Sequence, residues 1–380
     1  MVEILAWGST YYLLTILAGP IARDTGWPPA AVTAGISLGL VVSGLAAPRV
    51  GRLITRVGGR RVMTGGVLLV VGGLLLLAAA PAVPVYFAAW TLLGLGMACT
   101  LYEAAFSTLG QLYRADARSA ITALTLFGGF ASTVCWPLSA LLVEALGWRG
   151  TCLAYAGLHL LVSLPLCRLG LPRPRPGAPV PGAGPVAAAA AMPGFDLRFW
   201  CIAVAGICLV GLFTLLSVHL VAILRASGHP LEAAVALGAL IGPAQVGARM
   251  LEMLGRGRHH PIVTMIVATA LAALGVAGVA AGIPAAGLVA LGAGNGLWSI
   301  VKGALPLAIY PNEHYAPMVG RLALPMLLAS AAAPLAGTAL IEGLGAAAAL
   351  RVLAAVATIP CIAAIVFAVH LRRQGGANRG

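Results

Sequence analysis

Charged residues are scarce in this chain. Asp, Glu, Lys and Arg make up 9% of its 380 residues, and Lys302 is the only lysine. A typical soluble domain has about 25% charged residues. Hydrophobic residues reach 61% and mean hydropathy is +1.00. These values exclude an ordinary soluble domain and predict a polytopic membrane protein.

Several site patterns are also missing from the sequence. It has no GxxxxGK[ST] phosphate loop, so ATP is not the expected energy source. The seven cysteines are scattered through apolar runs without metal-ligand spacing, and we interpret them as small packing residues. No nucleophile–base constellation is visible, so we expect neither an enzyme nor a cofactor or metal site. The net charge of +13 comes from arginines near the ends of apolar runs, which indicates membrane topology rather than nucleic-acid binding.

The apolar runs predict an all-α membrane protein with twelve transmembrane helices in two pseudo-symmetric six-helix bundles. About 20 apolar residues cross a hydrocarbon core of roughly 30 Å. Segments of this kind occur at 4–22, 31–50, 62–80, 85–108, 119–143, 150–168, 198–224, 232–254, 262–282, 285–310, 318–341 and 347–370. The expected domains are a first half at 1–170, a Pro/Gly/Ala-rich cytoplasmic linker at 171–195, and a second half at 196–380 with a short basic tail.

The arginines predict the orientation. The connectors after every second helix carry most of them, so the positive-inside rule places those connectors and both termini in the cytoplasm. The first apolar run begins at Ile4 without a basic segment before it, so we expect a retained helix rather than a cleaved signal peptide. The Ala/Gly/Arg-rich usage fits a bacterial protein, and hence the inner membrane.

One stretch, Gly51–Val62 (GRLITRVGGRRV), is predicted to be a tight basic loop between two membrane helices, because an arginine at the bilayer centre costs about 2.5–3.5 kcal/mol. Its pattern resembles the signature loop of the major facilitator superfamily. The stretch Gly247–Arg258 repeats part of it after the equivalent helix of the second half. We therefore expect a conformational role for Gly51, Arg52, Thr55, Arg56, Gly58, Arg60 and Arg61.

The resemblance implies a monomeric secondary transporter that works by alternating access, with helices 1, 4, 7 and 10 around the substrate. Family members typically have an acidic residue where this chain has Thr55. The stretches GPIARDTGWPPAAV and Gln245–Arg249 resemble the monocarboxylate-transporter-like branch, in which an aspartate would occupy the position of Gln245.

Three charged residues lie inside predicted helices at similar depth: Glu103, Arg249 and Lys302. Such residues are candidates for function because hydrocarbon penalises them. Three interpretations remain open. Arg249 and Lys302 could bind an anion, Glu103 and Lys302 could pair as a gate with Glu103 as a proton carrier, or Arg249 could simply pair with Glu252 and anchor a helix end.

The predicted function is transport of a small organic anion or oxyanion, with protons as a possible coupling ion. An exporter of drugs or toxic molecules is the alternative, and a transporter-like sensor without flux is an alternative of another class. Further substrate-binding candidates are Gln245 on the eighth predicted helix, parts of which contribute to the cavity in this family, and, on the cavity helices, Tyr11, Tyr12, Tyr102, Asn295 and Trp298. Helix packing or interfacial anchoring would explain the latter five side chains equally well. His159 and His219 lie in apolar runs and are interpreted as structural.

Overall fold

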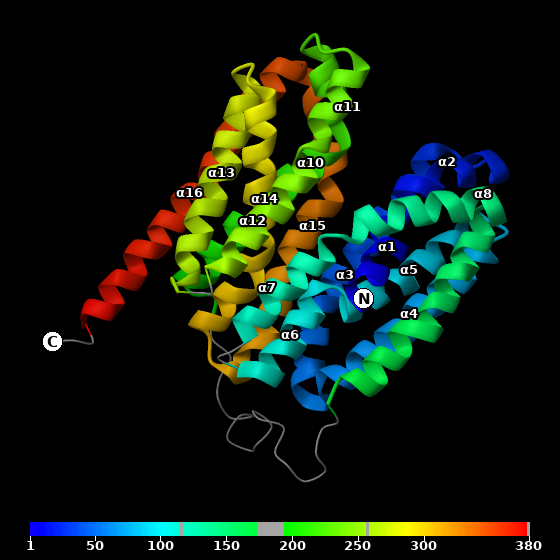
Figure 1. The fold of residues 1–380 in the computed structure, drawn as a ribbon, viewed down its shortest axis with the longest axis horizontal. Helices are drawn as coiled ribbons and strands as arrows, with labels where there is room; N and C mark the ends of the chain where they lie inside the picture. The colour runs from blue at the N-terminus through cyan, green and yellow to red at the C-terminus, as the bar shows by residue number, and fades with distance from the viewer. Residues whose placement is uncertain (115–116, 173–193, 256–257, 378–380) are drawn as a thin grey trace. The chain divides into compact units, whose positions relative to one another are not determined.

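The regular secondary structure is helical throughout the described part of the chain, residues 1–114, 117–172, 194–255 and 258–377, in a computed structural model (Figure 1). The first helices are α1 (Val2–Ser9), α2 (Leu13–Thr25), α3 (Pro29–Val57), α4 (Gly59–Ala78), α5 (Val83–Thr100), α6 (Tyr102–Tyr113), α7 (Ala117–Gly128) and α8 (Ala131–Leu158), followed by the π-helical turns η2 (His159–Ser163) and η3 (Leu166–Gly170). The later helices are α10 (Leu197–Ala226), α11 (Leu231–Ala239), α12 (Ile241–Leu254), α13 (Pro261–Ala280), α14 (Pro284–Ile309), α15 (Asn312–Leu344) and α16 (Ala346–Ala377).

The number of membrane crossings follows from the length of the helical stretches. Eleven stretches of the described chain are long and apolar enough to span a membrane. One of them, Ala117–Gly170, has 54 residues. At about 1.5 Å per residue it is far longer than a hydrocarbon core of roughly 30 Å. Gly147 interrupts it with φ 69° and ψ 175°, so this stretch crosses twice and the prediction of twelve helices is confirmed.

Two compact units make up the structure. Unit 1 contains Met1–Met192 together with Tyr310–Leu324, and unit 2 contains Pro193–Ile309 with Pro325–Gly380. The first part of α15 therefore packs with unit 1. The predicted linker falls almost wholly on residues 173–193, which lie outside the described residues, so the predicted domain boundaries stay a prediction.

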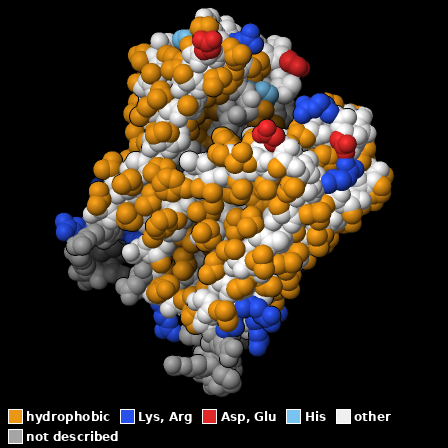
Figure 2. Space-filling model, turned by 45° about the vertical axis from the view of Figure 1, so that its right-hand side comes forward, with side chains coloured by type: hydrophobic (Ala, Val, Ile, Leu, Met, Phe, Trp, Pro, Cys, Tyr) orange, Lys and Arg blue, Asp and Glu red, His pale blue; other side chains and the backbone are white. Residues whose placement is uncertain are grey.

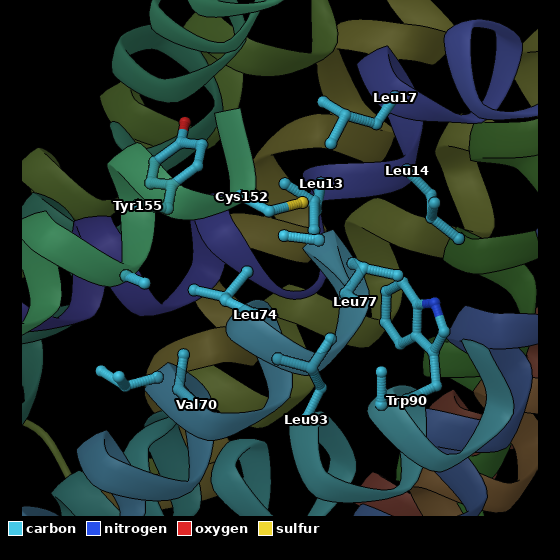
Figure 3. Close-up of a cluster of buried hydrophobic side chains, with 14 of the residues drawn as sticks. Leu13, Leu14, Leu17, Val70, Leu74, Leu77, Trp90, Leu93, Cys152 and Tyr155 are labelled. Atoms are coloured by element: carbon cyan, nitrogen blue, oxygen red, sulfur yellow. The ribbon is translucent and has the colours of Figure 1, made fainter. Parts of the chain in front are cut away.

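Unit 1 has a large apolar core. Leucines of α2 and α4 meet aromatic side chains of α5 and α8 there, and Figure 3 shows Leu13, Leu74, Trp90 and Tyr155 among its members. Across the face seen in Figure 2, wide hydrophobic areas separate a few groups of charged side chains. This distribution suits a protein whose outer surface meets lipid.

Two predicted helices are interrupted near the middle of their spans, where the sequence predicted continuity over 4–22 and 85–108. The break between α1 and α2 lies at Thr10, with φ −125° and ψ −83°. The break between α5 and α6 lies at Leu101, with ψ −175°. Threonine hydroxyls bond back to the preceding turn at both places: Thr10 donates to the Ala6 carbonyl at 2.5 Å, and Thr100 donates to the Gly96 carbonyl at 2.8 Å. Back-bonding of this kind bends helices, and neither break has a proline that the sequence could reveal.

Two further predicted helices are divided in the structure. In 119–143, α7 ends at Gly128 and α8 begins at Ala131, and in 232–254, α11 ends at Ala239 and α12 begins at Ile241. The turn after Gly147 is fixed from another helix. Trp148 donates its indole N–H to the Asp24 carboxylate at 2.9 Å, and the Arg149 guanidinium pairs with the same carboxylate. The two crossings of Ala117–Gly170 are therefore joined at a corner that is tied to the end of α2.

Glycines bring helix backbones into direct contact in unit 2. A Cβ added to Gly275 in α13 would lie 2.6 Å from the Leu291 backbone nitrogen, and one added to Gly287 in α14 would lie 2.6 Å from the Gly275 carbonyl oxygen. Side chains that small let transmembrane helices pack closely. The α13–α14 pair thus depends on two facing glycines.

We predict that Gly275→Ala lowers the thermal unfolding temperature of the purified protein, because overpacking a tight contact costs about 1–3 kcal/mol. Gly211→Ala in α10 is the matched control, since nothing lies within 4 Å of the added Cβ. Helix propensity favours Ala over Gly by about 1 kcal/mol there, so this variant should unfold no earlier than the parent protein. Equal unfolding temperatures for the two variants would contradict the prediction.

Candidate functional site

The predicted basic loop is almost entirely helical. Gly51, Arg52, Thr55 and Arg56 lie in the last turns of α3, while Arg60 and Arg61 lie in the first turn of α4. Gly58 alone lies outside the two helices, with φ 85° and ψ 147°. A glycine in this left-handed region can turn the chain within one residue, so the prediction of a twelve-residue loop was wrong.

The corner between α3 and α4 is held by hydrogen bonds to backbone carbonyls. The Thr55 hydroxyl donates to the Gly51 carbonyl of its own helix at 3.2 Å, whereas the Gln111 amide on α6 donates to the Ile54 carbonyl at 3.0 Å. The Arg60 guanidinium donates to the Leu171 carbonyl at 3.4 Å. The corner is therefore held by neutral acceptors and one arginine contact.

Gly51 has a packing role within unit 1. A Cβ on Gly51 would run into the carbonyl of Ala316 in α15, and a Cβ on Gly320 would run into the carbonyl of Ala47 in α3. The two helices therefore cross backbone to backbone, each presenting an alanine and, four residues later, a glycine. This reciprocal contact gives Gly51 of the motif a packing role at a helix crossing.

Aromatic side chains gather at the helix breaks of unit 1. The Trp7 ring lies 5.3 Å from Tyr11, 6.0 Å from Tyr12 and 4.9 Å from Tyr102, measured between ring centroids. Trp136 of α8 lies 5.9 Å from Tyr12. The structure thus brings the candidates Tyr11 and Tyr102 together through Trp7, which sequence reasoning missed.

Two carboxylates, Glu3 and Glu103, lie on helices α1 and α6, which also supply aromatic rings to this cluster. Glu3 is buried in the first turn of α1 and accepts a hydrogen bond from the Trp7 indole N–H at 3.1 Å. The spacing of four residues between Glu3 and Trp7 could have indicated this pair. Glu103 follows Tyr102 in the first turn of α6, where a carboxylate interacts favourably with the helix dipole.

Polar residues of unit 2 form two stripes on neighbouring helices. Gln245, Arg249 and Glu252 recur along α12, and Asn295, Trp298 and Lys302 recur along α14 with helical spacing. Glycines bring these helices together: a Cβ on Gly292 would lie 2.6 Å from the Ile241 carbonyl oxygen, and one on Gly296 would lie 2.5 Å from that of Gln245.

Arg249 lies one turn beyond this contact and is only 5% exposed. Its Nε donates to the Gly296 carbonyl at 3.3 Å and to the Ser299 hydroxyl at 3.1 Å. Its Nη1 is buried and has no hydrogen-bond partner among the described residues. A buried donor left unsatisfied costs about 1–3 kcal/mol, so the guanidinium is prepared to donate to a further acceptor.

The interpretation of Arg249 as an anchor that only pairs with Glu252 does not agree with this geometry, because the side chain is buried and turns toward α14. Glu252 instead accepts a hydrogen bond from Thr264 at 3.0 Å and lies 3.3 Å from His259. Arg256 and Gly257 of the repeated motif lie outside the described residues.

The remaining candidates have different surroundings. Trp298 is buried, and its indole N–H has no hydrogen-bond partner within the described chain. Gln245, Asn295 and Lys302 are half-buried on the same two helices. Ser299 was missed by sequence reasoning, although it lies three residues before Lys302. Glu103 and Lys302 belong to different units, so their pairing stays a prediction.

Comparison with known proteins decides the family. The family model described as Major Facilitator Superfamily matches residues 1–301. The chain belongs to the major facilitator superfamily. It is therefore a multi-pass membrane protein of a family of transporters, as its helices also indicate.

Relatives of this superfamily member are distant. It is 32% identical over 139 residues to human monocarboxylate transporter 6, a match that spans 36% of this chain but only 26% of the relative. That match supports the resemblance to the monocarboxylate-transporter-like branch. It is 27% identical over 323 residues, 82% of this chain and 79% of the relative, to an uncharacterized 38 kDa protein of Thermoproteus tenax.

Solved structures of superfamily members share the fold. The human organic anion transporter MFSD10 matches with a TM-score of 0.73 and 16% identity, covering 96% of this chain and 97% of that one. The fucose:proton symporter of E. coli matches with a TM-score of 0.70 and 14% identity over the same shares. Identities this low establish the fold and no more.

We predict that Gly51→Ala and Gly320→Ala each lower the thermal unfolding temperature, because each added methyl would press on a backbone carbonyl that cannot rotate away. The unfolding temperature of the double variant should fall by less than the sum of the decreases in the two single variants, since both substitutions relax the same helix crossing. Gly65→Ala on α4 is the control, because its Cβ would meet nothing within 4 Å. Strict additivity would show that the two glycines act at separate contacts.

Proposed function

We propose that this superfamily member is a secondary active transporter of a small organic anion or oxyanion, working by alternating access. The family supplies the transport class, and the substrate class rests on Arg249. We place the protein in a bacterial inner membrane with both termini in the cytoplasm, on the arginine distribution described above.

The surroundings of the Arg249 guanidinium carry the proposal. Both acceptors of its Nε are neutral oxygens of α14, and its buried Nη1 has no partner within the described residues. A buried cation is costly unless an anion neutralises it. A carboxylate or oxyanion would accept from the guanidinium fork with charge-assisted bonds.

Neighbouring groups suit the same ligand. The buried indole N–H of Trp298 on α14 is a further donor without a hydrogen-bond partner among the residues described, in addition to Arg249 Nη1 on α12. Lys302 adds a positive charge one turn further along that helix. Two cations and an indole donor on adjacent helices favour an acceptor-rich solute over a neutral one.

The names of similar proteins agree with this substrate class. One structural neighbour is named an organic anion transporter and one sequence relative a monocarboxylate transporter. Proton coupling is part of our proposal because another neighbour is named a fucose:proton symporter. Since the Gln245 side chain cannot ionise, we assign Glu103 as the candidate proton carrier.

We predict that lactate, succinate or sulfate raises the thermal unfolding temperature of the purified protein in a saturable manner. Arg249→Gln should weaken that binding about 10–100-fold, as expected for losing about 1.5–3 kcal/mol of charged hydrogen bonds. Arg249→Lys keeps the positive charge but lacks the two-pronged guanidinium, so its anion affinity should lie between those of the parent protein and of Arg249→Gln. Arg351→Gln, an exposed arginine of α16, is the matched control and should bind as the parent does.

Two results would oppose the proposal in different ways. Anion affinities unchanged in Arg249→Gln and in Ser299→Ala would remove Arg249 from the site. Saturable binding without solute flux in proteoliposomes would keep the site but favour the sensor alternative over transport.

A further inference from the structure

The aromatic cluster of unit 1 has no part in the anion site proposed for unit 2. Its connected rings are Trp7, Tyr11, Tyr12, Tyr102, Phe106 and Trp136. Trp7 is the common neighbour of three tyrosines. The rings come from α1, α6 and α8, which are labelled in Figure 1, and from the segment between α1 and α2 that contains Tyr11 and Tyr12.

Accessibility differs among the rings. Tyr102 and Phe106 are buried and stack with an interplanar angle of 8°, so they form the base of the cluster. Trp7, Tyr11 and Tyr12 are half-buried, and Trp136 is 41% exposed. Part of the aromatic surface is therefore exposed.

The cluster lies where the backbone is interrupted. Trp7, Tyr11 and Tyr12 flank the break at Thr10, and Tyr102 directly follows the break at Leu101. Irregular backbone within a membrane span is tolerated where protein buries it or water reaches it, and transporters place ligand sites at interrupted helices.

The electrostatic character of the cluster is negative. The faces of aromatic rings carry negative potential. The Glu3 carboxylate accepts the Trp7 indole proton at 3.1 Å, which adds electron density to the ring that contacts three others. Glu3 lies in α1 and Glu103 in α6, and neither these helices nor α5 contain Lys or Arg. The neighbouring helices α2, α7 and α8 carry Arg23, Arg118 and Arg149, of which Arg149 is paired with Asp24. A group attracted by this surface would carry positive charge.

We propose that the aromatic cluster binds an organic ammonium group by cation–π contacts, with Trp7 as the main contact and Tyr11 and Tyr12 beside it. Tryptophan is the strongest aromatic partner of a cation, and such contacts contribute about 0.5–2 kcal/mol. Glu3 is a positioning residue, which fixes the indole and makes its face more negative. This site goes beyond the anion site and does not depend on it.

The test uses the full-length protein in lipid nanodiscs, with choline as the probe and 3,3-dimethylbutan-1-ol as its uncharged isostere. Binding is followed by thermal unfolding and by tryptophan fluorescence. Choline should stabilise the protein saturably and bind about tenfold more tightly than the isostere, which has the same shape without the charge.

Variants locate the site. Trp7→Leu should remove the preference for choline over the isostere. Trp7→Phe keeps a ring in place and should retain part of the preference, about threefold, because phenylalanine is a weaker partner of cations. Glu3→Gln should also lower the ratio of the two affinities, which a purely structural role would leave unchanged. Trp200→Leu, at an exposed tryptophan of unit 2, is the control and should leave the ratio unaltered.

Either of two results would overturn the proposal. Equal affinities for choline and its isostere in the parent protein would show that the cluster recognises apolar shape. A choline preference that stays undiminished in Trp7→Leu and in Glu3→Gln would place the ammonium site elsewhere. Both results leave the anion site untouched, because its test uses other ligands and other residues.

Discussion

Close contact between helix backbones is the constraint on which this structure depends. Lipid tails are as apolar as leucine, so helices within a membrane gain little from the hydrophobic effect when they associate. Van der Waals contact has to stabilise the pairs, and glycine permits it. In unit 2, Gly292 and Gly296 bring α12 against α14. Because those backbones touch, Arg249 one turn later reaches a carbonyl of α14 instead of lipid or water.

Close backbone contact also determines the structural role of the signature motif. The sequence of Gly51–Val62 predicts a basic loop. In the structure Gly58 supplies the whole turn, while Gly51 supplies a backbone crossing with α15. Family members with an acid at the position of Thr55 have a charge to hold this corner. Here the Ile54 carbonyl accepts from Gln111, so a neutral hydrogen bond links α3 and α6.

Helix interruptions give the two units different chemistry although their helices repeat. In unit 1, threonine hydroxyls bond back to their helices at the breaks, and the rings around Trp7 collect there beside Glu3. In unit 2, α14 runs without interruption and carries cationic and amide groups. Unit 1 thus carries aromatic rings beside Glu3, and unit 2 carries Arg249 and Lys302 on α12 and α14.

The sequence alone predicted the class of protein and the twelve crossings, because hydropathy over 20 residues and the arginine pattern depend only on local composition. The family came from the resemblance of the motif at Gly51–Val62 and from the family model that matches residues 1–301. The sequence also identified Arg249 and Lys302, since a charge in an apolar run is visible without a fold. The tertiary structure decided what those residues contact. Ser299 as the partner of Arg249, Trp7 as the centre of the aromatic cluster, and the breaks at Thr10 and Leu101 depend on side chains that meet across helices, and no local pattern encodes which faces touch.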